Sequence, residues 1–124
     1  MVETVVVVDD DEAIREAMHD LLELEGFVVL VARDGYEALG VLAQAPRPCV
    51  AVVDLVMPRL DGWHVVRAIG EDPALRGIGV VCATASRAEP PPGCSALLRK
   101  PFEGEALITA IRLALTHAGH ALAL

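Results

Sequence analysis

The sequence predicts an α/β fold with a doubly wound, five-stranded parallel sheet. Short, continuous apolar runs alternate along the chain with longer segments of helical period, and this alternation is typical of parallel α/β folds. The runs lack the polar alternation of half-exposed strands, which indicates strands buried on both faces. The chain has 124 residues, 54% of them hydrophobic, which is enough for one packed core. We therefore expect a single domain over residues 1–124.

The predicted strands are runs dominated by β-branched residues, which favour extended backbone. Four of these runs are continuous and have the usual length of a strand, whereas the fifth is shorter and weaker. The expected strands are Thr4–Val8, Phe27–Val31, Cys49–Val53 and Ile78–Cys82, with Ser95–Leu98 as the weaker fifth.

Apolar residues at helical spacing predict a helix after each of the first three strands and another at the end of the chain. In the first helix, Ile14, Met18 and Leu22 fall on one face, and Gly26 marks the end. A capping-box-like Asp34-Gly-Tyr-Glu37 opens the second. The second helix is expected to end before Pro46, the third to run from Asp61 or Gly62 to before Pro73, and the last to span about Glu103–His117.

Composition and charge exclude several classes of function. Ten Lys and Arg residues stand against 18 Asp and Glu residues, a formal net charge of −8, which argues against binding a nucleic-acid backbone or an anionic membrane. No apolar run approaches the roughly 20 residues of a membrane-spanning helix, and the N-terminus lacks the pattern of a secretory signal. Cys49 and Cys82 lie in apolar runs and Cys94 makes an odd total of three. A reduced, cytoplasmic protein is the simplest interpretation.

Charged and hydroxyl side chains follow the predicted strands at the points where the apolar runs stop. Asp9 and Asp10 follow the first strand, Asp54 the third, Thr84 the fourth and Lys100 the fifth. Because doubly wound sheets place their sites at the carboxyl ends of the strands, we expect these side chains in one cleft. Two carboxylates about 4 Å apart repel each other by roughly 4 kcal/mol, so they need a cation, and oxygen ligands suit Mg²⁺. Carboxylates, a metal, a lysine and a hydroxyl together indicate phosphoryl transfer to aspartate.

These motifs give the chain a marked resemblance to the receiver domains of bacterial two-component response regulators. The matching segments are Val7–Asp11, Asp54–Gly62, Ala83–Ala85 and Lys100–Phe102, and they span almost the whole chain in the expected order. The resemblance implies a flavodoxin-like sheet with strand order 2-1-3-4-5. It also implies a signalling switch rather than an enzyme, which catalyses its own phosphorylation and dephosphorylation.

The resemblance further implies a role for each residue at the edge of the sheet. Asp54 would be the phosphoacceptor, and Asp10, assisted by Asp9 through water, would hold Mg²⁺ with Asp54 and the backbone carbonyl of Val56. Two residues would contact the phosphoryl group. Thr84 would donate a hydrogen bond to it, and Lys100, oriented by a cis Lys100–Pro101 bond, would form an ion pair with it. The implied partners are a histidine kinase or phosphotransfer protein and an unknown downstream protein.

The sequence departs from the family between the fourth and fifth strands. Only 15 residues, 85–99, separate Thr84 from Lys100, and they include Pro90–Pro92, which cannot continue a helix interior. The fourth helix of the family is therefore expected to be short or replaced by a loop. Leu97 occupies a position where the family often has an aromatic residue, so the usual threonine–aromatic switch is expected to be weakened or replaced. Apolar Val56 predicts slow self-dephosphorylation, because it cannot orient an attacking water.

Two other functions remain open from the residues alone. The first is a receiver-like scaffold that binds partners without being phosphorylated. The second is a Mg²⁺-dependent phosphatase or phosphotransferase with Asp9 as the nucleophile, because Asp9-Asp10-Asp11 contains an Asp-x-Asp pattern. These 124 residues contain no recognisable output domain, and both a stand-alone regulator and a domain of a longer chain fit them.

Overall fold

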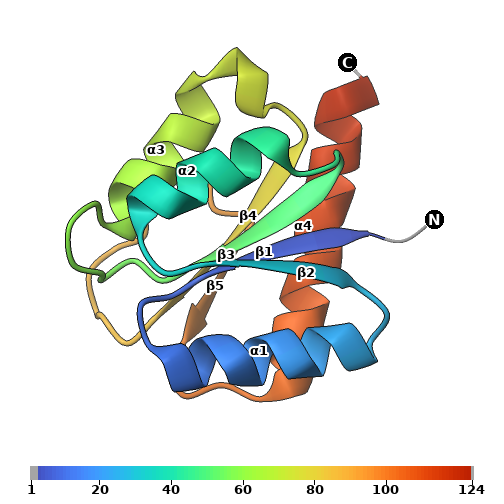
Figure 1. Cartoon of the computed structure of the whole chain (residues 1–124). Coiled ribbons are helices and arrows are strands. Elements are labelled where there is room, and N and C mark those ends of the chain that lie inside the picture. Colours follow the sequence, from blue (N-terminus) through green and yellow to red (C-terminus); the bar gives the residue numbers. More distant parts are fainter. Residues whose placement is uncertain (1–2, 124) are drawn as a thin grey trace.

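The chain forms a three-layered α/β structure around a central sheet (Figure 1). It is a computed structural model that describes residues 3–123, with side chains up to residue 119. All neighbouring strands are parallel, and their order is β2-β1-β3-β4-β5, as predicted. The strands are β1 (Thr4–Val8), β2 (Val28–Ala32), β3 (Cys49–Val53), β4 (Ile78–Thr84) and β5 (Ala96–Arg99).

Two helices cover each face of the sheet (Figure 1). One pair is α1 (Glu12–Leu24) with α4 (Gly104–Ala123), and the other is α2 (Gly35–Gln44) with α3 (Gly62–Glu71), followed by the short 3₁₀ helix η1 (Pro73–Leu75). The last helix extends past the predicted end at His117.

An aspartate caps the N-terminus of each of the first three helices. The Ile14 backbone N–H donates to Asp11, the Glu37 N–H to Asp34 and the His64 N–H to Asp61, at 2.9–3.1 Å. Aspartate favours this position because its carboxylate satisfies a free N–H at the helix start. These contacts confirm the predicted starts of the second and third helices and show that Asp11 caps the first.

The strand predictions are correct for β1 and β3 and shifted at one or both ends of the other strands. The register pairs Thr84 of β4 with Arg99 of β5, so pairing with the edge strand carries β4 two residues beyond the predicted end at Cys82. Such an extension depends on a neighbour that is distant in the sequence, which a local pattern does not contain.

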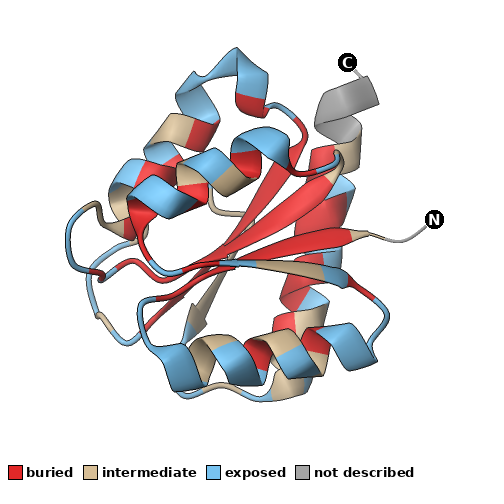
Figure 2. Cartoon of the chain, in the orientation of Figure 1, coloured by how far each residue is buried: buried red, intermediate tan, exposed pale blue. Residues whose placement is uncertain are grey.

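The core consists of two hydrophobic clusters, one on each face of the sheet (Figure 2). Alternate residues of the central strands supply both: Val6 and Val8 face one cluster, whereas Val5 and Val7 face the other. Every residue of β1, β3 and β4 is buried. This explains why these strands are continuous apolar runs rather than alternating ones.

No helix connects β4 to β5 among the described residues. Residues 85–95, hereafter the 85–95 segment, form bends and a turn in its place. This confirms the prediction from the short spacing and the three prolines.

The cysteines differ from the sequence-based interpretation. Cys82 and Cys94 form a disulfide, with their Cα atoms 6.2 Å apart, and Cys49 is free and buried. The expectation of reduced thiols is therefore wrong for two of the three residues. They come together because Cys94 lies just before β5, and β5 runs beside β4, where Cys82 pairs with Leu97.

None of the described helices is both long enough and apolar enough to cross a membrane.

Candidate functional site: a carboxylate and lysine cluster at the edge of the sheet

The carboxyl ends of β1 and β3 lie side by side, and this brings two aspartates together. The register pairs Val8 with Val53, and the hydrogen-bond ladder continues one step further, where the Asp54 N–H donates to the Val8 carbonyl at 2.9 Å. On the other side of β1, the Asp9 N–H donates to the Ala32 carbonyl at 3.1 Å. Asp9 and Asp54 are therefore held by the ladders of the central strands.

Three carboxylates form a compact acidic cluster at this edge. Asp9, Asp10 and Asp54 each place one oxygen so that all three lie within 4.8 Å of one another. Asp9 and Asp54 are buried, and Asp10 is exposed. Carboxylate oxygens, including one open to solvent, are a donor set suited to a hard divalent cation that keeps some of its waters. The cluster can therefore bind a metal ion.

Lys100 joins the two buried carboxylates. Its Nζ lies 2.7 Å from Asp9 Oδ2, where it donates a hydrogen bond, and 3.5 Å from Asp54 Oδ2. The Lys100 backbone N–H donates to the Thr84 carbonyl at 2.9 Å, and the Lys100–Pro101 bond is cis, as predicted. A positive charge is thus present between acids that come from strands far apart in the sequence.

Backbone N–H groups fix the orientation of both buried carboxylates. The Val56 N–H donates to Asp54 Oδ1 at 3.1 Å, and the Asp11 N–H donates to Asp9 Oδ1 at 2.9 Å. In each carboxylate the other oxygen, Oδ2, is the one nearest to Lys100. Val56, whose N–H contacts Asp54, is itself 58% exposed.

Thr84 ends β4 next to the cluster and is fully buried. Its Oγ1 accepts a hydrogen bond from the Ser86 N–H at 3.0 Å, which leaves the hydroxyl proton free to donate. The Arg99 guanidinium donates to the Ser86 carbonyl. The start of the 85–95 segment is thus tied to the ends of β4 and β5.

Burial and charge shift the pKa values of Asp54 and Lys100. Burial raises the pKa of Asp54, although the Val56 N–H and the Lys100 charge act against the shift. Burial by itself would lower the pKa of Lys100, but the hydrogen bond to Asp9 and the charges of Asp54 and Asp9 outweigh it and raise that pKa. Lys100 is therefore charged at neutral pH. Burial destabilises the ionised form of Asp54.

Sequence reasoning missed one residue at this edge. Arg15, on the first turns of α1, donates from Nη1 to the Asp9 carbonyl at 2.9 Å. The sequence contains only a weak signal, because an arginine on the polar face of an amphipathic helix normally faces solvent. Its contact depends on how α1 leaves the end of β1.

We expect metal-free protein to become more stable when Asp54 is replaced by asparagine. The raised pKa means that the folded state binds more protons at Asp54 than the unfolded state, so the free energy of unfolding falls as pH rises from the ordinary value of 3.8 through the folded pKa. Asp54→Asn removes this effect and should stabilise by about 1 kcal/mol at neutral pH in EDTA. Urea unfolding across acidic and neutral pH measures it, and a gain that does not grow with pH would contradict it.

Gly62 allows α3 to begin directly against the backbone that carries Asp54. A Cβ at Gly62 would overlap the Asp54 carbonyl and the Leu55 backbone. We expect Gly62→Ala to lower the free energy of unfolding by about 1–3 kcal/mol, measured by urea denaturation. Gly70→Ala on the same helix is the control, because a Cβ there has no neighbour within 4 Å, and it should be neutral or stabilising. Equal effects of the two changes would contradict the close-approach argument.

The cluster combines a buried pair of aspartates with a third, exposed aspartate, a lysine and a threonine, all at the carboxyl edge of a 2-1-3-4-5 sheet. This combination is the one expected of the receiver class. The family model described as "Response regulator receiver domain" matches residues 5–112. The chain belongs to this family, whose members act in two-component signalling.

Proteins named "Response regulator MprA" are among the relatives. The protein from Mycobacterium tuberculosis is 40% identical over 118 residues, and that from Mycolicibacterium vanbaalenii is 39% identical over 112 residues. Each match covers 87% of this chain and 48% of the relative. The chain thus spans about half the length of the curated relatives it matches.

Solved receiver domains share the fold. A CheY-like receiver domain protein from Methanospirillum hungatei superposes with a TM-score of 0.83 at 28% identity and covers 95% of this chain and 98% of its own. The chemotaxis response regulator CheY4 of Vibrio cholerae gives a TM-score of 0.80 at 27% identity, with coverage of 93% and 100%.

Proposed function

We propose that the chain accepts a phosphoryl group on the Asp54 carboxylate from a phosphohistidine of a histidine kinase or phosphotransfer protein. A carboxylate oxygen of Asp54 attacks phosphorus, the bond from phosphorus to the histidine nitrogen breaks, and an acyl phosphate forms. The observation that supports this best is the position of Lys100, whose Nζ lies 2.7 Å from Asp9 and 3.5 Å from Asp54. A cation at that place can follow the negative charge as it moves onto the phosphoryl oxygens.

We assign the metal site to the acidic cluster, with Mg²⁺ as the ion. Asp9, Asp10 and Asp54 would supply carboxylate oxygens, and the Val56 carbonyl would add a neutral one. When bound, Mg²⁺ supplies positive charge to the phosphoryl oxygens and offsets the repulsion among the three carboxylates.

Asp10→Asn should weaken Mg²⁺ binding about tenfold or more, because affinity depends on the number of charged ligands. Isothermal titration calorimetry measures the change. Asp11→Asn is the matched control: Asp11 is adjacent, but its carboxylate caps α1, and asparagine caps equally well. Equal loss of affinity in both variants would assign the effect to general surface charge and contradict the site.

Thr84 and Lys100 would then bind the phosphorylated side chain. The Thr84 hydroxyl has a free proton to donate, and a move toward the phosphoryl group would pull on its hydrogen bond to Ser86. The conformational change caused by phosphorylation would therefore pass into the 85–95 segment. It would not pass through an aromatic switch residue, because that position is Leu97, which pairs with Cys82 and packs against the core. This is the route by which phosphorylation would change the binding of a downstream protein.

The domain would act as a switch that catalyses its own phosphorylation and, slowly, its own dephosphorylation. The exposed apolar side chain of Val56 beside Asp54 cannot hold an attacking water by hydrogen bonds. We place the protein in the cytoplasm, where a disulfide is usually a transient, redox-responsive bond rather than a permanent one.

The test is intact mass after incubation with acetyl phosphate, with and without Mg²⁺. One added phosphoryl group that requires Mg²⁺ is the expected result, and peptide mapping should place it on Asp54. If no adduct forms with acetyl phosphate or with a panel of histidine kinases, the proposal fails and a scaffold that is never phosphorylated replaces it.

A further inference from the structure

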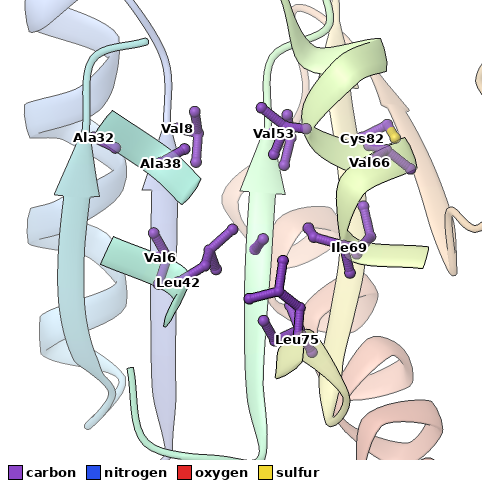
Figure 3. Close-up of a cluster of buried hydrophobic side chains, with 14 of the residues drawn as sticks. Val6, Val8, Ala32, Ala38, Leu42, Val53, Val66, Ile69, Leu75 and Cys82 are labelled. Carbon is purple, nitrogen blue, oxygen red and sulfur yellow. The ribbon is translucent and has the colours of Figure 1, made fainter. Parts of the chain in front are cut away.

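The Cys82–Cys94 disulfide lies outside the carboxylate cluster and has no part in the proposed phosphoryl transfer. It joins β4 to the end of the 85–95 segment across 12 residues. Cys82 is fully buried, and Cys94 is half-buried and packs against the hydrophobic cluster beneath α2 and α3. Figure 3 shows the Cys82 sulfur beside Val66 of α3. The bond therefore fixes the segment that stands in place of a helix.

Beside the disulfide, the 85–95 segment lies against α3. Next to Cys94, the Gly93 backbone approaches Val66 closely enough for a Cβ there to lie 3.7 Å from Val66 Cγ1. Pro91 and Pro92 form one wall of a groove of about 450 Å³, and Trp63 and Val66 of α3 contribute to the other. The segment contains no helix. The disulfide and the hydrogen bond from the Ser95 N–H to the Val80 carbonyl, at 2.8 Å, tie its end to β4.

We propose that Cys82 and Cys94 are a reversible thiol–disulfide pair, oxidised by exchange with a low-molecular-weight disulfide, and that oxidation fastens the 85–95 segment to β4. The site is thus a redox modification site in addition to the phosphoacceptor.

The unequal burial of the two sulfurs sets the order of the steps. The Cys94 thiolate, which solvent can reach, attacks one sulfur of the small disulfide and releases the first small thiolate. The Cys82 thiolate then attacks Cys94 Sγ in the mixed disulfide and releases the second. Two protein thiols are oxidised to one disulfide, the small disulfide is reduced to two thiols, and these carry away the two protons.

The third cysteine is an internal control. Cys49 is buried and free, and burial raises the pKa of its thiol despite the nearby charge of Arg47. Solvent does not reach this thiol, and Cys49 has no partner cysteine through which exchange could pass to it, as Cys82 has in Cys94. It should remain unmodified while the other two react.

The test titrates the folded protein with mixtures of reduced and oxidised glutathione, followed by acid quench, alkylation in denaturant and intact mass. Reduced protein should take up three alkyl groups, one for each cysteine in the sequence, and oxidised protein only one, on Cys49. Cys49→Ala should still cycle, between two groups and none. Cys94→Ser, at a half-buried position that tolerates a hydroxyl, should keep both remaining thiols free of an internal bond, and its circular dichroism spectrum should match the native one.

Hydrogen exchange provides a second measurement on the unchanged chain. Amides of residues 86–93 should exchange at least about tenfold faster after reduction, because the closed loop opens, whereas amides of β1 and β3 should not change. Three results would overturn the proposal: a pair that stays reduced at every glutathione ratio, a bond that dithiothreitol breaks only in denaturant, or equal exchange in the two states. None of these measurements involves phosphorylation, so each proposal can fail independently.

Discussion

Replacing Asp54 with asparagine should abolish the Mg²⁺-dependent phosphoryl adduct. The amide lacks the charged oxygen that attacks phosphorus, but it keeps the shape of the side chain and its contact with the Val56 N–H. Intact mass with acetyl phosphate and Mg²⁺ measures the result. Asp34→Asn is the matched control, because Asp34 is equally buried, at 8% exposure, but caps α2. It should be phosphorylated like the native chain.

An adduct that persists in Asp54→Asn would contradict the assignment and would indicate Asp9 as the nucleophile. The geometry argues against that alternative. Asp9 is 1% exposed, and both of its oxygens accept hydrogen bonds, one from the Asp11 N–H and one from Lys100. Asp54 is less buried and makes only the longer contact with the lysine. Of the two buried carboxylates, it is the one that a phosphodonor can reach.

Lys100→Met should slow phosphorylation by about 10²-fold or more, because a positioned charge at a developing anion contributes on that scale. The methionine keeps an unbranched side chain, one heavy atom shorter than that of lysine, but leaves Asp9 and Asp54 without their shared ammonium. The rate of adduct formation at saturating acetyl phosphate and Mg²⁺ is the measurement. Circular dichroism with and without Mg²⁺ checks that the variant is folded.

Arg99→Met provides the control for this prediction. It removes the same charge from the neighbouring residue, whose guanidinium holds the Ser86 carbonyl and makes no contact with the carboxylates among the interactions described. The phosphorylation rate of Arg99→Met should stay within a few-fold of the native rate. Comparable slowing in both variants would mean that net charge, rather than the position of the Lys100 ammonium, sets the rate.

Much of the carboxylate cluster was predictable because its residues follow directly after apolar runs. In a parallel sheet all strands end at one edge, so Asp54 and Lys100 were expected to meet although 45 residues, 55–99, separate them in the chain. The same logic placed Asp9 and Thr84. The apolar runs do not predict distances. Lys100 lies 2.7 Å from Asp9 and 3.5 Å from Asp54, and these distances depend on the twist of the sheet and on the path of the chain after β5.

The sequence alone determined the strand order through the family resemblance and the starts of the second and third helices through Asp34 and Asp61. It also determined the loss of a helix between β4 and β5, through three prolines in a short spacing. The helix starts and the proline-rich spacing are local properties of neighbouring residues, whereas the strand order rests on the resemblance. Only the tertiary structure decided that Cys82 pairs with Cys94 and that Arg15 reaches the Asp9 carbonyl. Both contacts depend on how the ends of adjoining elements are placed in space, and no periodicity along the chain encodes that placement.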